Sequence, residues 1–359
     1  MHQAQKPYNE LPLLPPKINL DDIDLLKLVN KANNSLYELK GIANILPNKL
    51  ILTSPLVIRE AVASSGIENI NTTVAEALKA DLVYKKSELN GAEKEILYYK
   101  DALLQGYDLL LKNNFLNTNS FIDIQAVLKP NKKGIRKIPG VQIANSTKGE
   151  VIYTPPEGQE IILEKLKNFE NYFNNSEGFF DIDPLIRMAI MHYQFEAIHP
   201  FLDGNGRIGR ILMILYLVMV SRLDLPILFL SKYILENRNK YYQLLNNITK
   251  KGEWIEWIMY ILKGVDEQAQ VTSQDIIKIK NLIEEYKEIK SNIINSKLID
   301  YLFSSPFYSQ NSLSENLEIH RNTASKYFLE LEKLKIVKKF KFKQGYIYYN
   351  NKFLDILSY

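Results

Sequence analysis

The sequence has 359 residues and no cysteine. The absence of thiols excludes disulfide bonds and thiolate metal sites, and it fits a reducing compartment. Long hydrophobic runs are missing too: the longest, residues 208–220, is interrupted by Arg210 and would form a helix of about 20 Å, whereas a bilayer core is roughly 30 Å thick. The first residues show no basic start followed by an apolar region, so a signal peptide is not expected. We therefore expect a cytoplasmic protein without a membrane partner.

A strong excess of one charge is also missing. The 45 Lys and Arg residues nearly balance the 41 Asp and Glu residues, which gives a net charge of +4. For a chain of this length, that charge is too small to indicate a nucleic-acid or membrane partner. Hydrophobic residues make up 46% of the chain, as in a globular protein with a sizeable core. The length predicts about two or three domains.

Apolar residues recur at helical spacing through most of the chain, so the expected fold class is mainly α. Two short β-prone runs around a polar turn are an exception, and they predict a β-hairpin over about residues 138–155. We divide the chain into a helical N-terminal region (1–115), a core (116–265), a connecting helix (266–290) and a C-terminal domain (291–359).

The C-terminal domain shows the order helix, turn, helix and two β-prone segments, residues 338–343 and 346–350, which is typical of a winged helix-turn-helix. Residues 320–343 contain eight Lys or Arg against two Glu, a composition that suits a phosphate-facing surface. The same lysines would suit the solvated face of an amphipathic helix. Binding to DNA, contact with a protein and a structural role therefore all stay open, and we expect His320 to be a turn residue rather than a ligand.

Residues 199–210, His-Pro-Phe-Leu-Asp-Gly-Asn-Gly-Arg-Ile-Gly-Arg, hold most of the chemically suggestive side chains. They contain the dinucleotide-binding pattern Gly-x-Gly-x-x-Gly, and Asp224 follows Gly204 by twenty residues. That pattern requires a preceding β-strand, but residues 184–197 have helical periodicity. The sequence therefore argues against a dinucleotide-binding fold.

The glycines of this motif precede a helix that we expect to begin near Ile208, so their backbone N–H groups can form a concave nest for an anion. Arg207 and Arg210 are three residues apart and can project to one side, where they suit a polyphosphate. The carboxylate of Asp203 suits Mg²⁺ bridging phosphate oxygens, and the amide of Asn205 suits a phosphate or the same ion.

His199 is the one group in this motif whose ordinary pKa lies near neutrality, so it can accept a proton from an attacking hydroxyl. Taken singly, a histidine before a glycine turn or an arginine on a helix is more typical of a structural or solvated residue. Their combination within twelve residues favours a catalytic nucleotide site.

The motif resembles, at every position, the Fic family signature His-Pro-Phe-x-Asp/Glu-Gly-Asn-Gly-Arg-x-x-Arg. The resemblance implies a Fic-type helical core with a hairpin flap, and AMPylation: transfer of AMP from ATP to a Ser, Thr or Tyr hydroxyl of a target protein or of the chain itself. It implies that His199 is the base and that Asp203 binds Mg²⁺. The ATP site implied by the resemblance comprises His199, Gly204, Asn205, Gly206, Arg207, Ile208, Gly209 and Arg210, with Arg210 at the γ-phosphate.

Two further segments resemble parts of this family. The hairpin at residues 138–155 is similar to the flap on which a target protein docks as an added strand. Tyr241 and Tyr242 resemble the tyrosine pair that some members place at the adenine, although tyrosines at this spacing also suit a helix core. The Asn expected shortly after that pair has three competing candidates: Asn246, Asn247 and Thr249.

Residues 64–69, Ser-Ser-Gly-Ile-Glu-Asn, match the inhibitory pattern of the same family, with Ser64, Glu68 and Asn69 at its fixed positions. The resemblance implies that the Glu68 carboxylate pairs with Arg210 and occupies the place of the γ-phosphate. ATP would then bind only in a geometry unfit for in-line transfer.

We therefore expect an autoinhibited protein adenylyltransferase with a C-terminal winged helix, and a homodimer is the default assembly. The alternative is a winged-helix DNA-binding regulator whose Fic core senses a nucleotide. Transfer of another phosphate-containing group is a third reading, but the complete motif has both arginines for a triphosphate tail and so favours ATP.

Overall fold

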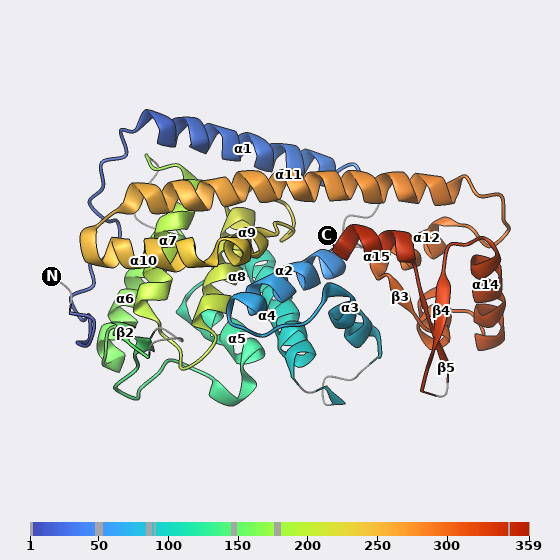
Figure 1. The fold of residues 1–359 in the computed structure, drawn as a ribbon, viewed down its shortest axis with the longest axis horizontal. Helices are drawn as coiled ribbons and strands as arrows, with labels where there is room; N and C mark the ends of the chain where they lie inside the picture. The colour runs from blue at the N-terminus through green and yellow to red at the C-terminus, as the bar shows by residue number, and fades with distance from the viewer. Residues whose placement is uncertain are drawn as a thin grey trace. The chain divides into compact units, whose positions relative to one another are not determined.

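The computed structural model describes residues 3–46, 53–83, 88–89, 91–144, 149–175, 181–343 and 345–358. Its contacts divide the chain into two compact units, Met1–Tyr37 with Asp101–Ala269 and Glu38–Lys100 with Gln270–Tyr359. Three helices contribute residues to both units (Figure 1): α1 (Ile23–Ala43), α4 (Ala92–Asn113) and α11 (Trp254–Lys287). The four regions drawn from the sequence stay a prediction.

The first unit contains the motif at residues 199–210 and a small hairpin. Its remaining elements are α5 (Thr118–Leu128), the 3-10 turn η3 (Pro130–Lys132), β1 (Ile143–Ala144), β2 (Val151–Tyr153), α6 (Gln159–Phe173), α7 (Pro184–Ile198), α8 (Asn205–Met219), α9 (Leu230–Glu236) and α10 (Arg238–Lys251). β1 and β2 pair antiparallel, with Ile143 opposite Tyr153, which confirms the predicted hairpin. Residues 145–148 of its turn lie outside the described part of the chain.

Two consecutive helices, α7 and α8, form the centre of this unit. The side chain of Asp183 caps α7 by accepting a hydrogen bond from its first turn, and Pro184 occupies a position where no N–H is needed. Most residues of both helices are buried, as the long apolar run predicts. The helices approach closely at Gly209, where an added Cβ would lie 2.4 Å from the Glu196 carboxylate and 3.2 Å from the His192 ring. A side chain at position 209 would therefore have to displace the Glu196 carboxylate and press against the His192 ring.

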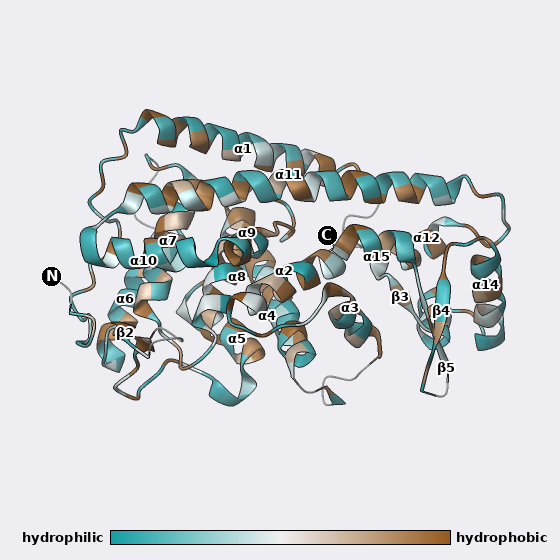
Figure 2. Cartoon of the chain, in the orientation of Figure 1, coloured by the Kyte–Doolittle hydropathy of each residue, from teal (hydrophilic) through white to brown (hydrophobic). Residues whose placement is uncertain are grey.

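Hydrophilic and hydrophobic residues alternate along α11 (Figure 2), as expected for an amphipathic helix. Its buried face includes Trp257, Ile261 and Val265. Val265 and Asp266, between which we placed the end of the core, lie within this one continuous helix. No helix in the described ranges is long and apolar enough to cross a membrane.

The second unit combines helices of the N-terminal third with the C-terminal residues. Its elements are α2 (Thr53–Ile67), α3 (Val74–Val83), α12 (Ser296–Ser304), β3 (Phe307–Tyr308), α13 (Gln310–Leu317), α14 (Arg321–Lys333), β4 (Lys338–Phe342), β5 (Gly345–Tyr349) and α15 (Asn351–Ser358). Both α2 and α3 contact α15. A buried ion pair of 2.8 Å joins Arg59 of α2 to Asp275 of α11, so α2 shares a packed core with the C-terminal residues.

The C-terminal part of this unit has the element order that the sequence predicts. After α13 and α14, β4 and β5 pair antiparallel, and β3 completes a sheet of order β3-β5-β4. The sheet packs on α14 through Phe328 and Tyr348, whose rings stack at 3.8 Å. The His320 side chain accepts a hydrogen bond from the N–H of Asn322 at the start of α14, which confirms it as a turn residue. The mainly α fold class, with a hairpin and this C-terminal domain, is confirmed.

Candidate active site

The motif forms a short loop, residues 199–204, between the end of α7 and the start of α8. His199 ends α7 in the left-handed conformation (φ 50°, ψ 57°), and its backbone N–H donates to the carbonyl of Phe195. A non-glycine residue in this conformation is uncommon and is held by its surroundings. The residue as a whole is half-buried, and the Nδ1 atom of its imidazole is buried, so the ring is held in a fixed loop.

The side chain of Asn205 holds the loop closed. Its Oδ1 accepts a hydrogen bond from the N–H of Phe201 at 2.9 Å, and its Nδ2 donates to the carbonyl of the same residue at 2.8 Å. Asn205 is 2% exposed. We expected this amide to meet a phosphate or metal, and the structure gives it a second task that spacing alone did not indicate, the shaping of the loop.

The first turn of α8 offers backbone N–H groups to an anion. The helix begins at Asn205, one turn earlier than the expected start near Ile208, because Gly204 adopts a left-handed conformation (φ 84°) and serves as the N-cap. Among the described residues no side chain caps this end, and Gly206 lies in the first turn. The arrangement is the usual protein site for a phosphate.

Both arginines of the motif lie on α8 close to this end. Arg207 is 2% exposed and Arg210 is 1% exposed, so each guanidinium is held within the protein. Arg207 lies 3.7 Å from the carboxylate of Asp203. Two buried guanidiniums close to a helix N-terminus are the kind of groups that bind a polyphosphate.

Three cations surround the carboxylate of Asp203. Lys132 donates to it at 2.7 Å, and Lys129 lies at 3.5 Å. Burial raises the pKa of Asp203, but the lysines and Arg207 outweigh burial and hold that pKa below its usual range. The carboxylate is therefore charged at neutral pH.

Nucleotide sites usually bind Mg²⁺ through one or two carboxylates, and phosphate oxygens and waters supply the other ligands. A single ionised carboxylate such as that of Asp203 is therefore sufficient on the protein side. The Asp203 side chain is 30% exposed and can be reached from solvent. The described ranges contain no cluster of three or more His, Cys, Asp or Glu side chains that could hold a metal ion by themselves. The donor set thus suits an ion that arrives with ATP, and Lys132 is its competitor for the carboxylate.

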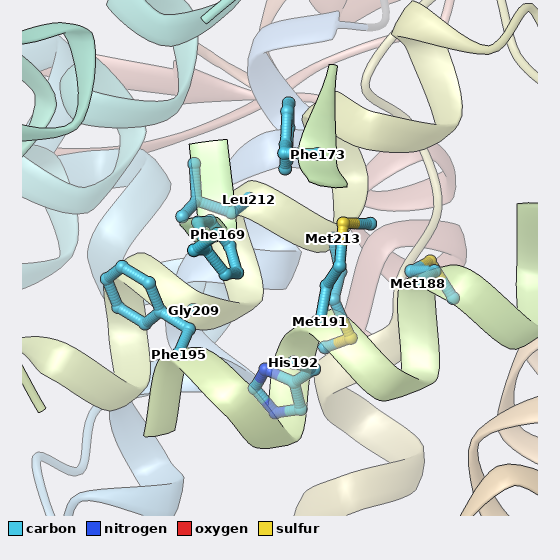
Figure 3. Close-up of a pocket in the computed structure, with 9 residues that line it drawn as sticks. All are labelled: Phe169, Phe173, Met188, Met191, His192, Phe195, Gly209, Leu212 and Met213. Atoms are coloured by element: carbon cyan, nitrogen blue, oxygen red, sulfur yellow. The ribbon is translucent and has the colours of Figure 1, made fainter. Parts of the chain in front are cut away.

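Ile208 and Gly209 face the protein interior. Ile208 is fully buried, and Gly209 fits against His192 and Glu196 of α7. Figure 3 shows His192 and Gly209 at a small cavity that is otherwise lined by apolar side chains. Both residues thus serve the packing of α7 on α8, Ile208 by its buried side chain and Gly209 by the lack of one.

Buried aromatic residues connect this packing to α10. The Nε2 atom of His192 lies 2.9 Å from the hydroxyl of Tyr241, and its ring stacks on Trp257. Burial, and next the positive charge of Arg210, lower the pKa of His192 to about 3, so this imidazole is neutral at physiological pH. His192 therefore supports the site from within the core.

The two candidate adenine-binding tyrosines differ in their surroundings. Tyr241 is 1% exposed and is bonded to His192, whereas Tyr242 is 42% exposed and meets Tyr241 edge to face. Of the two rings, only that of Tyr242 is exposed, and the guanidinium of Arg238 lies over it, 5.8 Å from its centroid. Among the three candidates for the following Asn, Asn247 donates to Glu253, and the hydroxyl of Thr249 lies 2.9 Å from that of Tyr193.

Hydrogen bonds from Arg136, a residue that the sequence did not single out, connect the flap to the motif. Arg136, before β1, donates from Nε to the carbonyl of His199 at 2.7 Å and from Nη2 to the carbonyl of Pro156. In β2, Tyr153 donates to the carbonyl of Ala197 at 2.8 Å. Residues 130–140 have a basic sequence, and lysine-rich loops are usually solvated, so nothing in the spacing marks Arg136 as buried.

The inhibitory pattern lies at the C-terminal end of α2 in the second unit. Ser64 is fully buried, Glu68 is exposed, and Asn69 has a left-handed backbone (φ 61°). The N–H of Ile70 donates to the carbonyl of Ser65 and closes the turn. The carboxylate is thus presented just beyond a firmly packed helix end, and its pairing with Arg210 stays a prediction.

Comparisons with known proteins agree with the motif. Three family models match: "Fic/DOC family N-terminal" over residues 26–108, "Fic/DOC family" over 115–217, and "Protein adenylyltransferase SoFic-like, C-terminal domain" over 279–353. The chain is 31% identical over 141 residues to Protein adenylyltransferase fic-1 of Caenorhabditis elegans, which covers 39% of this chain and 24% of that protein. It is 23% identical over 288 residues to Protein adenylyltransferase Fic of Drosophila virilis, covering 76% and 52%.

A solved structure shares the fold across nearly the whole chain. A crystal structure of a Fic family protein from Desulfovibrio desulfuricans G20 superposes with a TM-score of 0.56 and 18% identity, covering 94% of this chain and 98% of that one. The chain spans about half or less of the curated relatives that it matches. With the complete motif between α7 and α8, these matches show that the chain belongs to the Fic/DOC family.

Proposed function

We propose that this chain is an autoinhibited protein adenylyltransferase that transfers AMP from ATP to a hydroxyl group of a target protein or of itself. The proposal rests on the start of α8, where an uncapped helix end, two buried arginines and the ionised Asp203 adjoin the loop of His199. The relatives from Caenorhabditis elegans and Drosophila virilis are named protein adenylyltransferases, which supports the same activity.

The proposed reaction requires one proton acceptor and an anion-binding site. His199 accepts the proton of a Ser, Thr or Tyr hydroxyl as its oxygen forms a bond to the α-phosphorus of ATP. The bond between that phosphorus and the oxygen bridging to the β-phosphate breaks, and pyrophosphate leaves with the bonding electrons. The N–H groups of Asn205, Gly206 and Arg207 in the first turn of α8 stabilise the growing negative charge.

The remaining residues bind and orient ATP. Asp203 would hold Mg²⁺, which neutralises phosphate charge and stabilises the leaving pyrophosphate when it is bound. Arg207 binds phosphate oxygens, and Arg210 binds the γ-phosphate. Tyr242 offers its exposed ring to the adenine, while Tyr241 supports it from the core.

The target is proposed to dock on the flap. Within residues 138–155, β1 and β2 form a two-stranded ribbon, and Tyr153 of β2 donates to the carbonyl of Ala197, two residues before His199. An extended segment can add to such a ribbon through main-chain hydrogen bonds. This mode of docking uses few side chains of the target, so it would suit several proteins that share an extended loop with a hydroxyl residue.

Inhibition is proposed to come from Glu68. Its exposed carboxylate at the end of α2 has the charge and size to pair with Arg210 in place of the γ-phosphate. Ser64 and Asn69 shape the helix end that presents it, since Ser64 is buried and Asn69 takes the left-handed position after the last turn.

Labelled ATP tests this function directly. Glu68→Gly is expected to increase the incorporation of labelled AMP into the chain or into lysate proteins, and adding His199→Ala should abolish it while ATP binding persists. Glu318→Gly is a matched control, because Glu318 is also an exposed glutamate at a helix C-terminal end of the second unit. If Glu68→Gly behaves like Glu318→Gly, Glu68 is not the inhibitor; if no variant transfers AMP, the proposed activity is wrong.

A second candidate function rests on the charge of the C-terminal domain. Arg321, Lys326 and Lys333 of α14 are exposed, as are Lys338 and Lys341 of β4, and such a helix and wing suit the phosphates of DNA. Under this alternative the chain is a DNA-binding regulator with a nucleotide-sensing Fic core. A gel shift with genomic fragments at two salt concentrations tests it, and sedimentation of the free chain tests the proposed homodimer.

A further inference from the structure

A buried guanidinium, Arg136, lies behind the loop of His199. Arg136 is 2% exposed. Its side chain donates to three main-chain carbonyls, those of Ile198 at 3.3 Å, His199 at 2.7 Å and Pro156. The first two end α7, and the third follows the flap, so one side chain joins two separate segments.

No other side chain can readily replace the guanidinium of Arg136 in these three hydrogen bonds. Burial lowers the pKa of Arg136, but the last carbonyls of a helix carry partial negative charge and favour a cation. Hydrogen bonds from a charged donor are about twice as strong as neutral ones. Only the planar fork of a guanidinium can donate in several fixed directions at once, and a lysine ammonium offers a single point of charge.

Main-chain contacts extend the same connection. The backbone N–H of Arg136 donates to the carbonyl of Pro200 at 2.9 Å, and Ile135 forms a bridge with Phe201. The flap leaves the core after Arg136 and returns at Pro156, so both of its ends meet at this guanidinium. The Tyr153 hydroxyl adds a further bond to the last turn of α7.

We propose that Arg136 is a positioning residue that fixes the flap against the loop of His199, so that a hydroxyl docked on the flap meets the imidazole at the right distance. This inference rests on the proposed transfer of AMP. It assigns Arg136 no contact with ATP: the carbonyls that it binds form the back of the loop, whereas the phosphates lie at the start of α8. Loss of Arg136 should therefore affect transfer far more than nucleotide binding.

The test compares Arg136→Met and Arg136→Lys with Arg187→Met, all in the Glu68→Gly chain. Arg187 is also a buried arginine of the first unit, 4% exposed and donating to the carbonyl of Tyr172, and it lies in the first turn of α7, at the opposite end of that helix from His199. Since a misplacement of about 1 Å can cost about 100-fold in rate, Arg136→Met should lower the rate of AMP transfer by about 100-fold while the affinity for a fluorescent ATP analogue stays within about twofold. Arg136→Lys should recover part of the rate, and guanidinium ion should restore part of it in Arg136→Ala.

Hydrogen–deuterium exchange provides a readout that does not depend on transfer. Arg136→Met should speed exchange in residues 149–157 and 199–205 together, and Arg187→Met should leave both segments unchanged. A rate of transfer in folded Arg136→Met equal to that of its parent would overturn the inference, as would equal losses in the two Met variants or exchange unchanged in both segments. If the parent transfers no AMP, the proposed function fails instead, whatever the exchange data show.

Discussion

Asn205 makes two hydrogen bonds with the backbone of a single residue, Phe201, one in each direction and both within 2.9 Å. The amide thereby satisfies both the backbone N–H and the carbonyl of Phe201 within the loop between α7 and α8. Because Asn205 is also the first residue of α8, the loop and the helix end that should receive phosphate are fixed by the same side chain.

Asn205→Ala would leave a buried N–H and a buried carbonyl of Phe201 without their partners. An unsatisfied buried group costs about 1–3 kcal/mol, so we expect thermal unfolding at lower temperature and a clear loss of ATP affinity. Asn168→Ala is the matched control, because Asn168 makes the same two-way pairing with Leu14 away from the motif. It should lose similar stability and keep ATP affinity. Equal ATP affinity in both variants would contradict a special role for the Asn205 pairing.

Gly204→Ala should weaken nucleotide binding through the backbone. The left-handed conformation costs an L-residue about 1–2 kcal/mol, and an added Cβ would lie 3.0 Å from the Leu128 side chain. The control is Gly252→Ala at the end of α10. It imposes a similar backbone strain (φ 69°), but no neighbouring atom lies within 4 Å of the added Cβ. Calorimetric titration with ATP should show a loss of affinity for Gly204→Ala, and an equal affinity in both variants would remove Gly204 from the anion site.

Lys132→Ala should lower the Mg²⁺ concentration that AMP transfer requires. The Lys132 ammonium occupies an oxygen of Asp203 that the ion would use, and an exposed ion pair is worth up to about 1 kcal/mol. The Mg²⁺ concentration for half-maximal AMP transfer should therefore fall by about twofold to fivefold. Lys133→Ala removes the next lysine, which is also exposed, and should change nothing. An increased Mg²⁺ requirement in Lys132→Ala would show instead that Lys132 binds phosphate.

The buried imidazole of His192 should make stability depend on pH in an acidic window. In the unfolded chain it takes up a proton near its ordinary pKa of 6.5, but in the folded chain only near about 3. Its contribution is therefore complete above pH 6.5 and is lost as pH falls toward 3, by about 1 kcal/mol per pH unit. Chemical denaturation of His192→Gln between these pH values should show a shallower loss of the free energy of unfolding than the parent.

The control for that measurement is His320→Asn, which removes an exposed histidine and keeps a side chain able to cap α14. Its stability should follow the parent across the same pH range. A parallel loss of stability in His192→Gln and the parent would show that carboxylates, and not His192, dominate the acid sensitivity.

Local patterns in the sequence predicted what depends on local chemistry. The spacing in residues 199–210 indicated an anion site before a helix, and the structure has a left-handed Gly204 and an uncapped α8 at that place. Alternation around a polar turn predicted the hairpin, and the order of helices and β-prone runs predicted the C-terminal domain. Each of these features follows from backbone conformation and periodicity within a few residues.

Other features depend on which distant side chains meet. Arg136, which the sequence offered only as one cation of a basic loop, is buried against α7, while Lys132 of the same loop stays exposed beside Asp203. Tyr241 and its neighbour Tyr242 likewise separate into a core residue and an exposed one. Spacing cannot predict these differences, because burial of a polar group is decided by partners brought from elsewhere in the chain. The sequence by itself thus determined the chemical groups of the site, and the tertiary structure decided which of them are accessible and which hold the others in place.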